Sequence, residues 1–378
     1  MGQRESALED VVNPWQGRRV FLTGHTGFKG GWLSQWLARR GARIRGYALD
    51  PAGPPDFFAA TRVGDVLDDV RGDIRDSAKL EAAMREFHPE VVFHLAAQPL
   101  VRRSYADPLE TYATNVMGTA HVLEAVRKTA SVRAVVCVTT DKCYQNREWV
   151  WPYRETDPLG GYDPYSSSKA CAEMVAAAYR SSFFPVDRFD EHRVGVATAR
   201  AGNVIGGGDW SEDRLIPDLI RGFQAGQAAP IRQPKAVRPW QHVLESLLGY
   251  QLIAEQLLAG RAQFASAYNL GPGDEEAWPV ERMATKLAEL WGSGAAWACD
   301  TAPTPHEARF LRLDSSKARA ELDWRPMLET ETALKWTVEW YRAWSNGAEM
   351  RSVTEEQIAA YEGLTAARSP RSRAAAGI

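Results

Sequence analysis

The sequence predicts an α/β protein: a doubly wound parallel sheet with a smaller C-terminal α/β domain. Apolar runs typical of buried strands alternate with helical patterns up to residue 200, and a glycine-rich loop follows the first run. Beyond that point the alternation is lost. We therefore expect an arm over residues 1–17, a sheet domain over 18–202, a second domain drawn mainly from 203–350, and a tail over 351–378 with a disordered end.

Composition excludes several classes of function. The 378 residues carry a formal net charge of −3, which gives no basic surface for nucleic acid. The apolar runs are too short to cross a bilayer, and the first residues lack the apolar core of a signal peptide. The four cysteines show neither CxxC nor zinc-ligand spacing, so we expect free thiols, no metal site and a cytoplasmic protein.

A dinucleotide-binding loop is indicated after the first strand, which is predicted over 19–23. Gly24, Gly27 and Gly30 follow as GxxGxxG, and apolar residues at helical spacing come next. Gly24 would permit a tight turn, Gly27 the approach of a pyrophosphate, and Gly30 the close packing of helix on strand. The helix N-terminus would then face the phosphates. The whole loop is expected to bind the dinucleotide: Gly24, Thr26, Gly27, Phe28, Lys29 and Gly30.

The next strands add cofactor residues. Asp50 ends the strand at 43–49, where a carboxylate suits ribose hydroxyls and favours NAD over NADP; a turn-forming Asp is the alternative. Asp73 and Ile74 would lie near the adenine, unless Asp73 caps the helix predicted over 77–87. After the strand that begins at residue 90, small Ala96 and Ala97 leave room for a ribose, whereas His94 inside that strand is expected to be a core histidine.

Polar residues follow the apolar run at 135–138: Thr139, Thr140, Asp141 and Lys142. In an open α/β sheet, chemistry takes place just past the carboxyl ends of the strands, so these side chains would face a substrate.

Tyr165 and Lys169 lie four residues apart on a helix that begins near Asp163 and Pro164. A lysine ammonium beside a phenol would favour the phenolate, so Tyr165 could exchange a proton near neutral pH. Taken alone, the pair would indicate a solvated helix face, since such pairs are common on helix surfaces. The Thr-Asp-Lys strand end and the dinucleotide loop favour the catalytic interpretation instead. Later elements are expected as follows: strands at 193–200 and 268–271, a ligand-facing glycine loop at 201–210, and helices at 214–225, 244–258, 280–290 and 330–344.

Over residues 18–345 these features resemble the extended short-chain dehydrogenase/reductase superfamily, whose pattern includes the glycine loop, Asp50, Asn115, Thr140 and Tyr165-x-x-x-Lys169. Within it, five segments resemble the CDP-glucose 4,6-dehydratases: HLAAQPLVR (94–102), TTDKCYQNREW (139–149), GGYDPYSSSK (160–169), RAGNVIGGGDW (200–210) and RPWQHV (238–243).

This resemblance implies a Rossmann-type fold with tightly bound NAD. It also implies conversion of CDP-D-glucose to CDP-4-keto-6-deoxy-D-glucose by oxidation at C4, loss of water across C5–C6 and hydride return to C6. Tyr165 would take the 4-hydroxyl proton, Lys169 would hold the nicotinamide ribose, and Thr140 would bond the reacting oxygen. Asp141 would protonate the departing 6-hydroxyl. Lys142 replaces the Glu of many 4,6-dehydratases and would be the C5 base only when neutral.

The resemblance adds Leu95, Asn115 and Thr139 to the cofactor site. It implies that five residues bind the substrate: Gln98, Arg102, Asn203, Arg214 and Arg238. Arg238 would grip the diphosphate, or else form a surface ion pair. It further implies a homodimer or homotetramer, paired through the helices after Asn115 and Tyr165. Apolar Val122, Leu123, Met174 and Val175 on those helices fit such pairing. Surface-sugar synthesis, as in O-antigen and lipopolysaccharide, would be the typical pathway.

Three other functions stay open. A nucleotide-sugar 4-epimerase shares Tyr-x-x-x-Lys and NAD, but it has no departing hydroxyl to protonate. A 4,6-dehydratase acting on another nucleoside-diphosphate glucose differs only in its base. A non-catalytic NAD-binding regulator would not need Thr140, Tyr165 and Lys169 together.

Overall fold

The computed structural model describes residues 13–292, 294–300, 308 and 310–368. Its centre is a seven-stranded parallel sheet in the order β3-β2-β1-β4-β5-β6-β10, and the strand order reverses between β1 and β4. This arrangement confirms the doubly wound, Rossmann-type prediction. The strands are β1 (Arg19–Thr23), β2 (Arg43–Ala48), β3 (Asp68–Arg71), β4 (Val91–His94), β5 (Ala134–Val138), β6 (Gly195–Ala201) and β10 (Ala267–Leu270).

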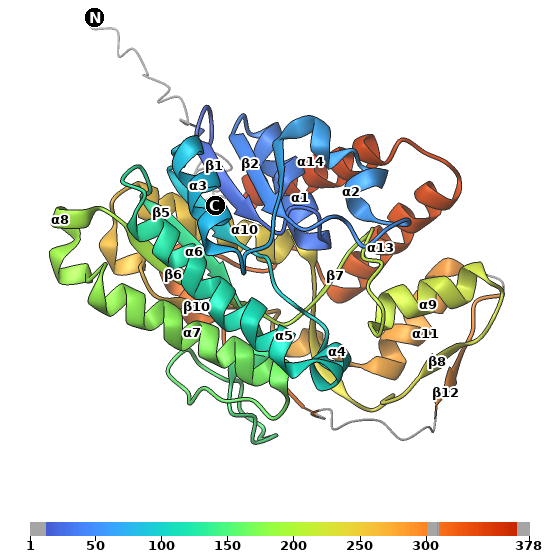
Figure 1. Cartoon of the computed structure of the whole chain (residues 1–378). Coiled ribbons are helices and arrows are strands. Elements are labelled where there is room, and N and C mark those ends of the chain that lie inside the picture. Colours follow the sequence, from blue (N-terminus) through green and yellow to red (C-terminus); the bar gives the residue numbers. More distant parts are fainter. Residues whose placement is uncertain (1–12, 293, 301–307, 309, 369–378) are drawn as a thin grey trace, which may run out of the picture.

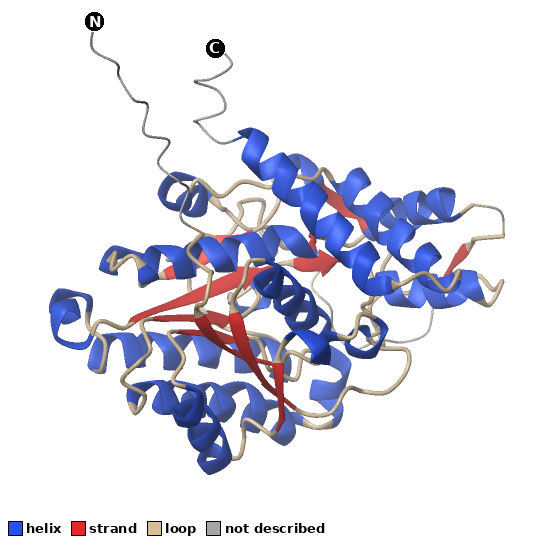
Figure 2. Cartoon of the chain, turned by 90° about the horizontal axis from the view of Figure 1, so that it is seen from above, coloured by secondary structure: helices blue, strands red, loops and turns tan. Residues whose placement is uncertain are grey.

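Helices cover both faces of this sheet, as Figure 2 shows. Alternate residues of each strand enter opposite cores: Val20 and Leu22 of β1 pack on one side, and Phe21 packs on the other. Both faces are therefore buried, which explains why the central strands are continuously apolar. The first core includes helices α1 (Phe28–Arg39), α10 (Val243–Leu258), α13 (Thr330–Ser345) and α14 (Met350–Arg368), and the second includes α3 (Ser77–Phe87), α6 (Gly118–Arg127) and α7 (Pro164–Ser182).

The C-terminal half supplies two small sheets, β11-β9-β7 and β12-β8, with helices beside them (Figure 1). It does not separate cleanly at residue 202, because α10 packs on the large sheet and β10 joins it. The elements are β7 (Asn203–Ile205), α9 (Leu215–Gln224), β8 (Ala229–Ile231), β9 (Val237–His242), η5 (Ala262–Phe264), η6 (Asp274–Glu276), β11 (Ala277–Pro279), α11 (Val280–Trp291), β12 (Trp297–Cys299) and α12 (Ser316–Leu322). Short pieces in the first half are α2 (Phe57–Ala60), η1 (Val63–Val66), α4 (Val101–Ala106), α5 (Pro108–Tyr112), η2 (Ala113–Met117), η3 (Asp141–Cys143), η4 (Val186–Arg188) and α8 (Phe189–His192).

The prediction of an N-terminal arm is wrong for residues 13–17. Trp15 is fully buried in the first core, and its Nε1 donates to Glu255 Oε1 of α10 at 2.6 Å. Residues 13–17 thus belong to the fold, while residues 1–12 of the predicted arm lie outside the described residues.

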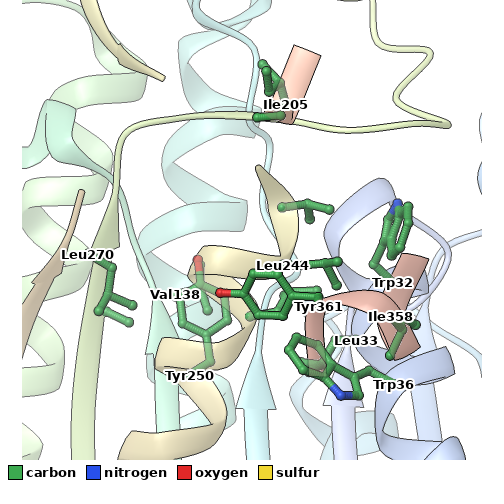
Figure 3. Packing of buried hydrophobic residues seen from close by; sticks show 14 of the residues in the cluster. Trp32, Leu33, Trp36, Val138, Ile205, Leu244, Tyr250, Leu270, Ile358 and Tyr361 are labelled. Carbon is green, nitrogen blue, oxygen red and sulfur yellow. The ribbon is translucent and has the colours of Figure 1, made fainter. Parts of the chain in front are cut away.

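The expected tail is also wrong over residues 351–368, which form most of α14. Ile358 and Tyr361 of this helix are fully buried and face Trp36 of α1, as Figure 3 shows. Glu362 accepts a hydrogen bond from Trp36 Nε1 at 2.8 Å. The rest of the predicted disorder, 369–378, lies outside the described residues.

The described part of the chain can be compared with the expectations for membrane spans and for cysteines. No helix there is both long and apolar enough to cross a membrane. All four cysteines have free thiols, and Cys137 and Cys143 are buried.

Glu245 of α10 ties α14 to the core. Its Oε2 bonds the Tyr361 hydroxyl at 2.5 Å, and its Oε1 accepts from the Met327 and Leu328 amides at 2.8 and 2.7 Å. Burial raises the pKa of Glu245 to about 7, and these hydrogen bonds oppose the rise only in part. The folded protein therefore holds a proton that the unfolded chain releases near pH 4.5.

We expect the stability of the protein to fall as pH rises through this window. At ~1.4 kcal/mol per pKa unit, Glu245 removes roughly 3 kcal/mol of unfolding free energy between about pH 4.5 and pH 7. Glu245→Gln cannot ionise, so its stability relative to the wild type should rise by a similar amount between pH 5 and pH 8 in urea titrations. The exposed Glu339→Gln should show a flat difference. A flat difference for Glu245→Gln would contradict the assignment.

Candidate active site

A cavity of about 1070 Å³ lies at the carboxyl end of the large sheet. Its walls come from the loop after β1, the ends of β4 and β5, the start of α7, and the segments around β7, α9, β8 and β9. Most of the predicted site residues line it: Gly24, Thr26, Gly27, Phe28, Lys29, Gly30, Asp73, Ile74, Leu95, Ala96, Ala97, Gln98, Arg102, Thr139, Thr140, Lys142, Tyr165, Lys169, Asn203, Arg214 and Arg238. Asp50, Asn115 and Asp141 do not.

The glycine loop needs its glycines for space. Gly24 has φ +83°, and a Cβ there would lie 2.7 Å from the Ala96 amide nitrogen. A Cβ on Gly30 would overlap the Gly24 carbonyl, so α1 can approach the loop only without a side chain at this position. These contacts confirm the turn and packing roles predicted for Gly24 and Gly30. A Cβ on Gly27 would meet only the Gly24 carbonyl oxygen, at 3.5 Å, so this face of the loop stays open.

Lys29 brings a partly buried amine to the same loop. Burial, together with the positive charges of Arg214 and Lys169, lowers its pKa to about 7, while Asp141 and Asp209 act in the opposite direction. Lys29, Arg214 and Lys169 are among the basic side chains that line the cavity. An anion that enters beside Lys29 would favour its charged form.

Two predicted cofactor residues lie elsewhere. Asp50 follows β2 with 87% of its side chain exposed, 3.8 Å from the Arg71 guanidinium. Asn115 is buried: its amide donates to Gln98 O and Ser168 Oγ, and its Oδ1 accepts from Gln98 N. Asn115 therefore ties the segment after β4 to α7 and presents no atom to the cavity. Asp73 lines the cavity and binds Arg75, whereas the cap of α3 is Asp76.

His94 is a core residue, as predicted. Its two ring nitrogens bond the hydroxyls of Thr23 and Thr119 at 2.8 and 3.1 Å. Burial lowers its pKa to about 3, so the ring is neutral. No group of acidic, His or Cys side chains suited to a metal ion occurs among the described residues.

The polar residues after β5 meet the catalytic helix. Tyr165 and Thr140 share a hydrogen bond, and the Thr140 hydroxyl bonds Asp141 Oδ1 at 3.0 Å. Lys142 Nζ lies 3.9 Å from the same carboxylate oxygen, with 33% of its side chain exposed. Asp141 is only 1% exposed, and its Oδ2 is buried without a partner among the described residues. An unpaired carboxylate oxygen beside a cavity is typical of a functional group.

The protonation states differ from the sequence-based expectation. Burial raises the pKa of Tyr165 to about 12, although Thr140 and Arg214 oppose the rise. Burial also lowers the pKa of Lys169 to about 8, and its ammonium donates to the Val138 carbonyl at 3.2 Å. The expected lowering of the Tyr165 pKa is thus wrong for the ligand-free site, because desolvation of the phenol outweighs every nearby positive charge.

The sequence analysis did not predict a buried network of an ion pair and hydrogen bonds that lies behind these residues. Arg200 of β6 pairs with Glu173 of α7 at 2.7 Å, and both side chains are less than 5% exposed. Glu173 also accepts hydrogen bonds from Thr139 and Thr198 at 2.5 and 2.8 Å. The signal was in the sequence, since Glu173 follows Lys169 by four residues and Tyr165 by eight. It could not be recognised without knowing that this face of α7 points inward.

The predicted substrate residues lie on both sides of the cavity. Arg102 of α4 binds Asp213, and Arg214 binds Asp209, each near 3 Å. Arg238 donates to the carbonyls of Val237 and Ala308 and is only 8% exposed, so it is not a surface residue. Asn203 Oδ1 is buried with no partner among the described residues. The Gln98 side chain bonds Leu100 and Thr111 and is only 5% exposed as a residue.

This geometry agrees with comparisons to known proteins. The sequence profile of the GDP-mannose 4,6-dehydratase family matches residues 21–337. The chain belongs to this family. A relative in Salmonella typhimurium, named CDP-glucose 4,6-dehydratase, is 52% identical over 93% of this chain and 98% of its own length. A dTDP-glucose 4,6-dehydratase of Streptomyces antibioticus is 30% identical over 85% of this chain and 92% of its own.

Solved structures show the same fold in other family members and their neighbours. The dTDP-glucose 4,6-dehydratase of Streptomyces venezuelae, with NAD bound, is 27% identical with a TM-score of 0.73, and the match covers 88% of this chain and 99% of that one. The UDP-glucose 4-epimerase of Thermus thermophilus, in complex with NAD, is 25% identical with a TM-score of 0.74, covering 86% and 99%.

We expect the Arg200–Glu173 pair to be essential for stability. Arg200→Met keeps much of the side-chain volume but leaves Glu173 buried without its cation, which should cost about 3–5 kcal/mol of unfolding free energy. The exposed Arg193→Met removes the pair with Asp190 and should cost less than about 0.5 kcal/mol. Urea denaturation of both variants makes the comparison. Equal losses would show that the buried pair has no special role.

Proposed function

We propose that this protein is a CDP-glucose 4,6-dehydratase that converts CDP-D-glucose to CDP-4-keto-6-deoxy-D-glucose and water. The observation that carries the proposal is the 52% identity with the Salmonella enzyme of that name over almost the whole of both chains. The gathering of Thr140, Lys142, Tyr165 and Lys169 on one cavity, with Asp141 directly behind them, supports it.

The sheet side of the cavity fits NAD. Gly24 and Gly27 leave the loop backbone open beside the N-terminus of α1, which suits a pyrophosphate, and small Ala96 and Ala97 leave space at the end of β4. Bound NAD would supply the hydride acceptor for C4 and the hydride donor for C6. Asp73 and Ile74 would lie at its adenine end and Lys169 at its nicotinamide ribose. Asp50 is exposed at the surface and would contact only the adenosine ribose.

At C4 the chain supplies a base and its support. Tyr165 would take the 4-hydroxyl proton, with Thr140 bonded to the same oxygen. A phenol whose pKa is about 12 is protonated near neutral pH and cannot accept a proton. Positive charge near Tyr165 in the complex must therefore lower its pKa and favour the phenolate. Lys169 is held within the same buried site by the Val138 carbonyl and would supply part of this charge.

At C5 and C6 the chain supplies an acid and a base. Asp141 would donate a proton to the departing 6-hydroxyl through its unpaired Oδ2. Lys142 lines the cavity 3.9 Å from Asp141 and is the proposed C5 base. Arg102, Arg214, Arg238 and Asn203 would hold the diphosphate, and Gln98 lines the same cavity.

Incubation with CDP-glucose tests this proposal and separates its steps. The wild type should form a 4-keto-6-deoxy product with alkaline absorbance, whereas a 4-epimerase would form CDP-galactose. Asp141→Asn keeps the shape but cannot donate a carboxylic proton. It should form NADH, stall before water leaves, and lose roughly two to four orders of magnitude in turnover.

Tyr165→Phe is the matched variant, because it should block the first hydride transfer and form no NADH in a single-turnover absorbance measurement. Normal turnover of Asp141→Asn, or NADH accumulation by Tyr165→Phe, would contradict these roles.

We also propose a homodimer, or a homotetramer built from it, in a cytoplasmic pathway of surface-sugar synthesis. Val122 and Leu123 do not support pairing as expected, because both are fully buried in the core. The exposed apolar face is formed instead by Leu109 and Tyr112 of α5, Met117 of η2 and Met174 of α7. A face of this kind on adjacent helices suits a second copy related by two-fold symmetry.

Met174→Asp should break this pairing, because it places a charge on the exposed apolar face. Sedimentation at micromolar protein should show a monomer with an unchanged circular dichroism spectrum. Val186→Asp removes an exposed apolar residue of η4 and should remain a dimer. A monomeric wild type would exclude the proposal.

A further inference from the structure

The cavity has an arm that the chemistry at Tyr165 does not use. Residues of β8 and of the first turn of α9 line this arm. Figure 1 shows these two elements on the side of the molecule away from β1 and β2. The dinucleotide loop occupies the sheet side, so the base of a nucleotide sugar bound at Arg238 would enter this arm. Its polar side chains are Asp213, Asp218, Arg232 and Gln233.

Asp218 is held in place by a hydrogen bond to one of its carboxylate oxygens. Arg221 donates to Asp218 Oδ1, and Arg221 itself is anchored on the carbonyls of Trp210 and Ser211. Asp218 lines the cavity, and 31% of its side chain is exposed. A carboxylate that Arg221 holds in place, and that is largely buried, therefore lies on the wall of the arm.

The other charged groups of the arm are already paired. Asp213 Oδ1 accepts from Arg102 at 2.9 Å and from Arg232 at 2.8 Å. This bridge joins α4 to the segment after β8 and sets the Arg232 guanidinium on the wall of the arm. The arm thus offers the Asp218 carboxylate as a hydrogen-bond acceptor.

We propose that Asp218 determines the choice of pyrimidine by accepting a hydrogen bond from the 4-amino group of cytosine. Asp and Glu accept from this amino group in nucleic-acid recognition as well. Uracil and thymine carry an oxygen at C4, which would face the carboxylate without a proton between them. The inference rests on the proposed dehydratase function and extends it to the base.

The test is the ratio of kcat/KM for CDP-glucose to that for UDP-glucose. Asp218→Asn keeps the shape, but its amide can also donate to a C4 oxygen. The ratio should fall roughly 5- to 150-fold, the range for one base contact, with activity on UDP-glucose maintained or increased. Because both substrates are assayed on one preparation, a partly folded variant changes both rates equally and leaves the ratio intact.

Glu212→Gln is the matched control, since it removes the same charge from the same segment at an exposed residue that does not line the cavity. It should keep the wild-type ratio. A wild type without preference for CDP-glucose, or an unchanged ratio in Asp218→Asn, would overturn the inference.

Calorimetric titration with CMP and UMP separates the inference from the proposed function. If no nucleoside-diphosphate glucose is turned over, the dehydratase proposal fails. The base contact is then still supported when Asp218→Asn lowers the preference for CMP, and overturned when it does not.

Discussion

The ion pair between Arg200 and Glu173 holds the catalytic helix against the sheet. Glu173 lies one helical turn after Lys169, so its position sets both the height and the rotation of the α7 face that carries the reactive side chains. Desolvating two charges is costly, and here every available oxygen of Glu173 is satisfied by Arg200, Thr139 or Thr198. The end of β5 and the face of α7 are thereby fixed together.

The same pair reaches beyond the first domain. Arg200 also donates to the Tyr144 hydroxyl, which in turn donates to Asn269 of β10. The segment after Asp141 and the last strand of the sheet are thus joined to one buried cation. These contacts help to hold β10, which comes late in the chain, against the segment that follows β5.

Two of the buried polar atoms that lack a partner in the described part of the chain, and two lysines with a lowered pKa, lie where chemistry is proposed. Asp141 Oδ2 and Asn203 Oδ1 are buried without partners among the described residues, and Lys29 and Lys169 lose part of their charge through burial. Each of these features lowers the stability of the folded chain, and each would be relieved by a polar or anionic ligand. Part of the stability cost of buried polar groups therefore lies at the cavity, and another part lies in the core at Glu245.

By itself the sequence determined the parallel sheet, most of its helices and the glycine loop, because apolar period, glycine spacing and helix caps act over a few residues. It also determined that Thr140 and Tyr165 would come together, since strand ends converge in this architecture. Tertiary structure alone decided the rest. Asn115 and Val122 turn inward, Asp50 stays at the surface, and residues around Tyr361 form a core helix, because each outcome depends on how distant elements pack. Asn115 bonds Ser168, and Tyr361 bonds Glu245. Burial, which no local pattern encodes, likewise set the protonation of Tyr165 and Lys169.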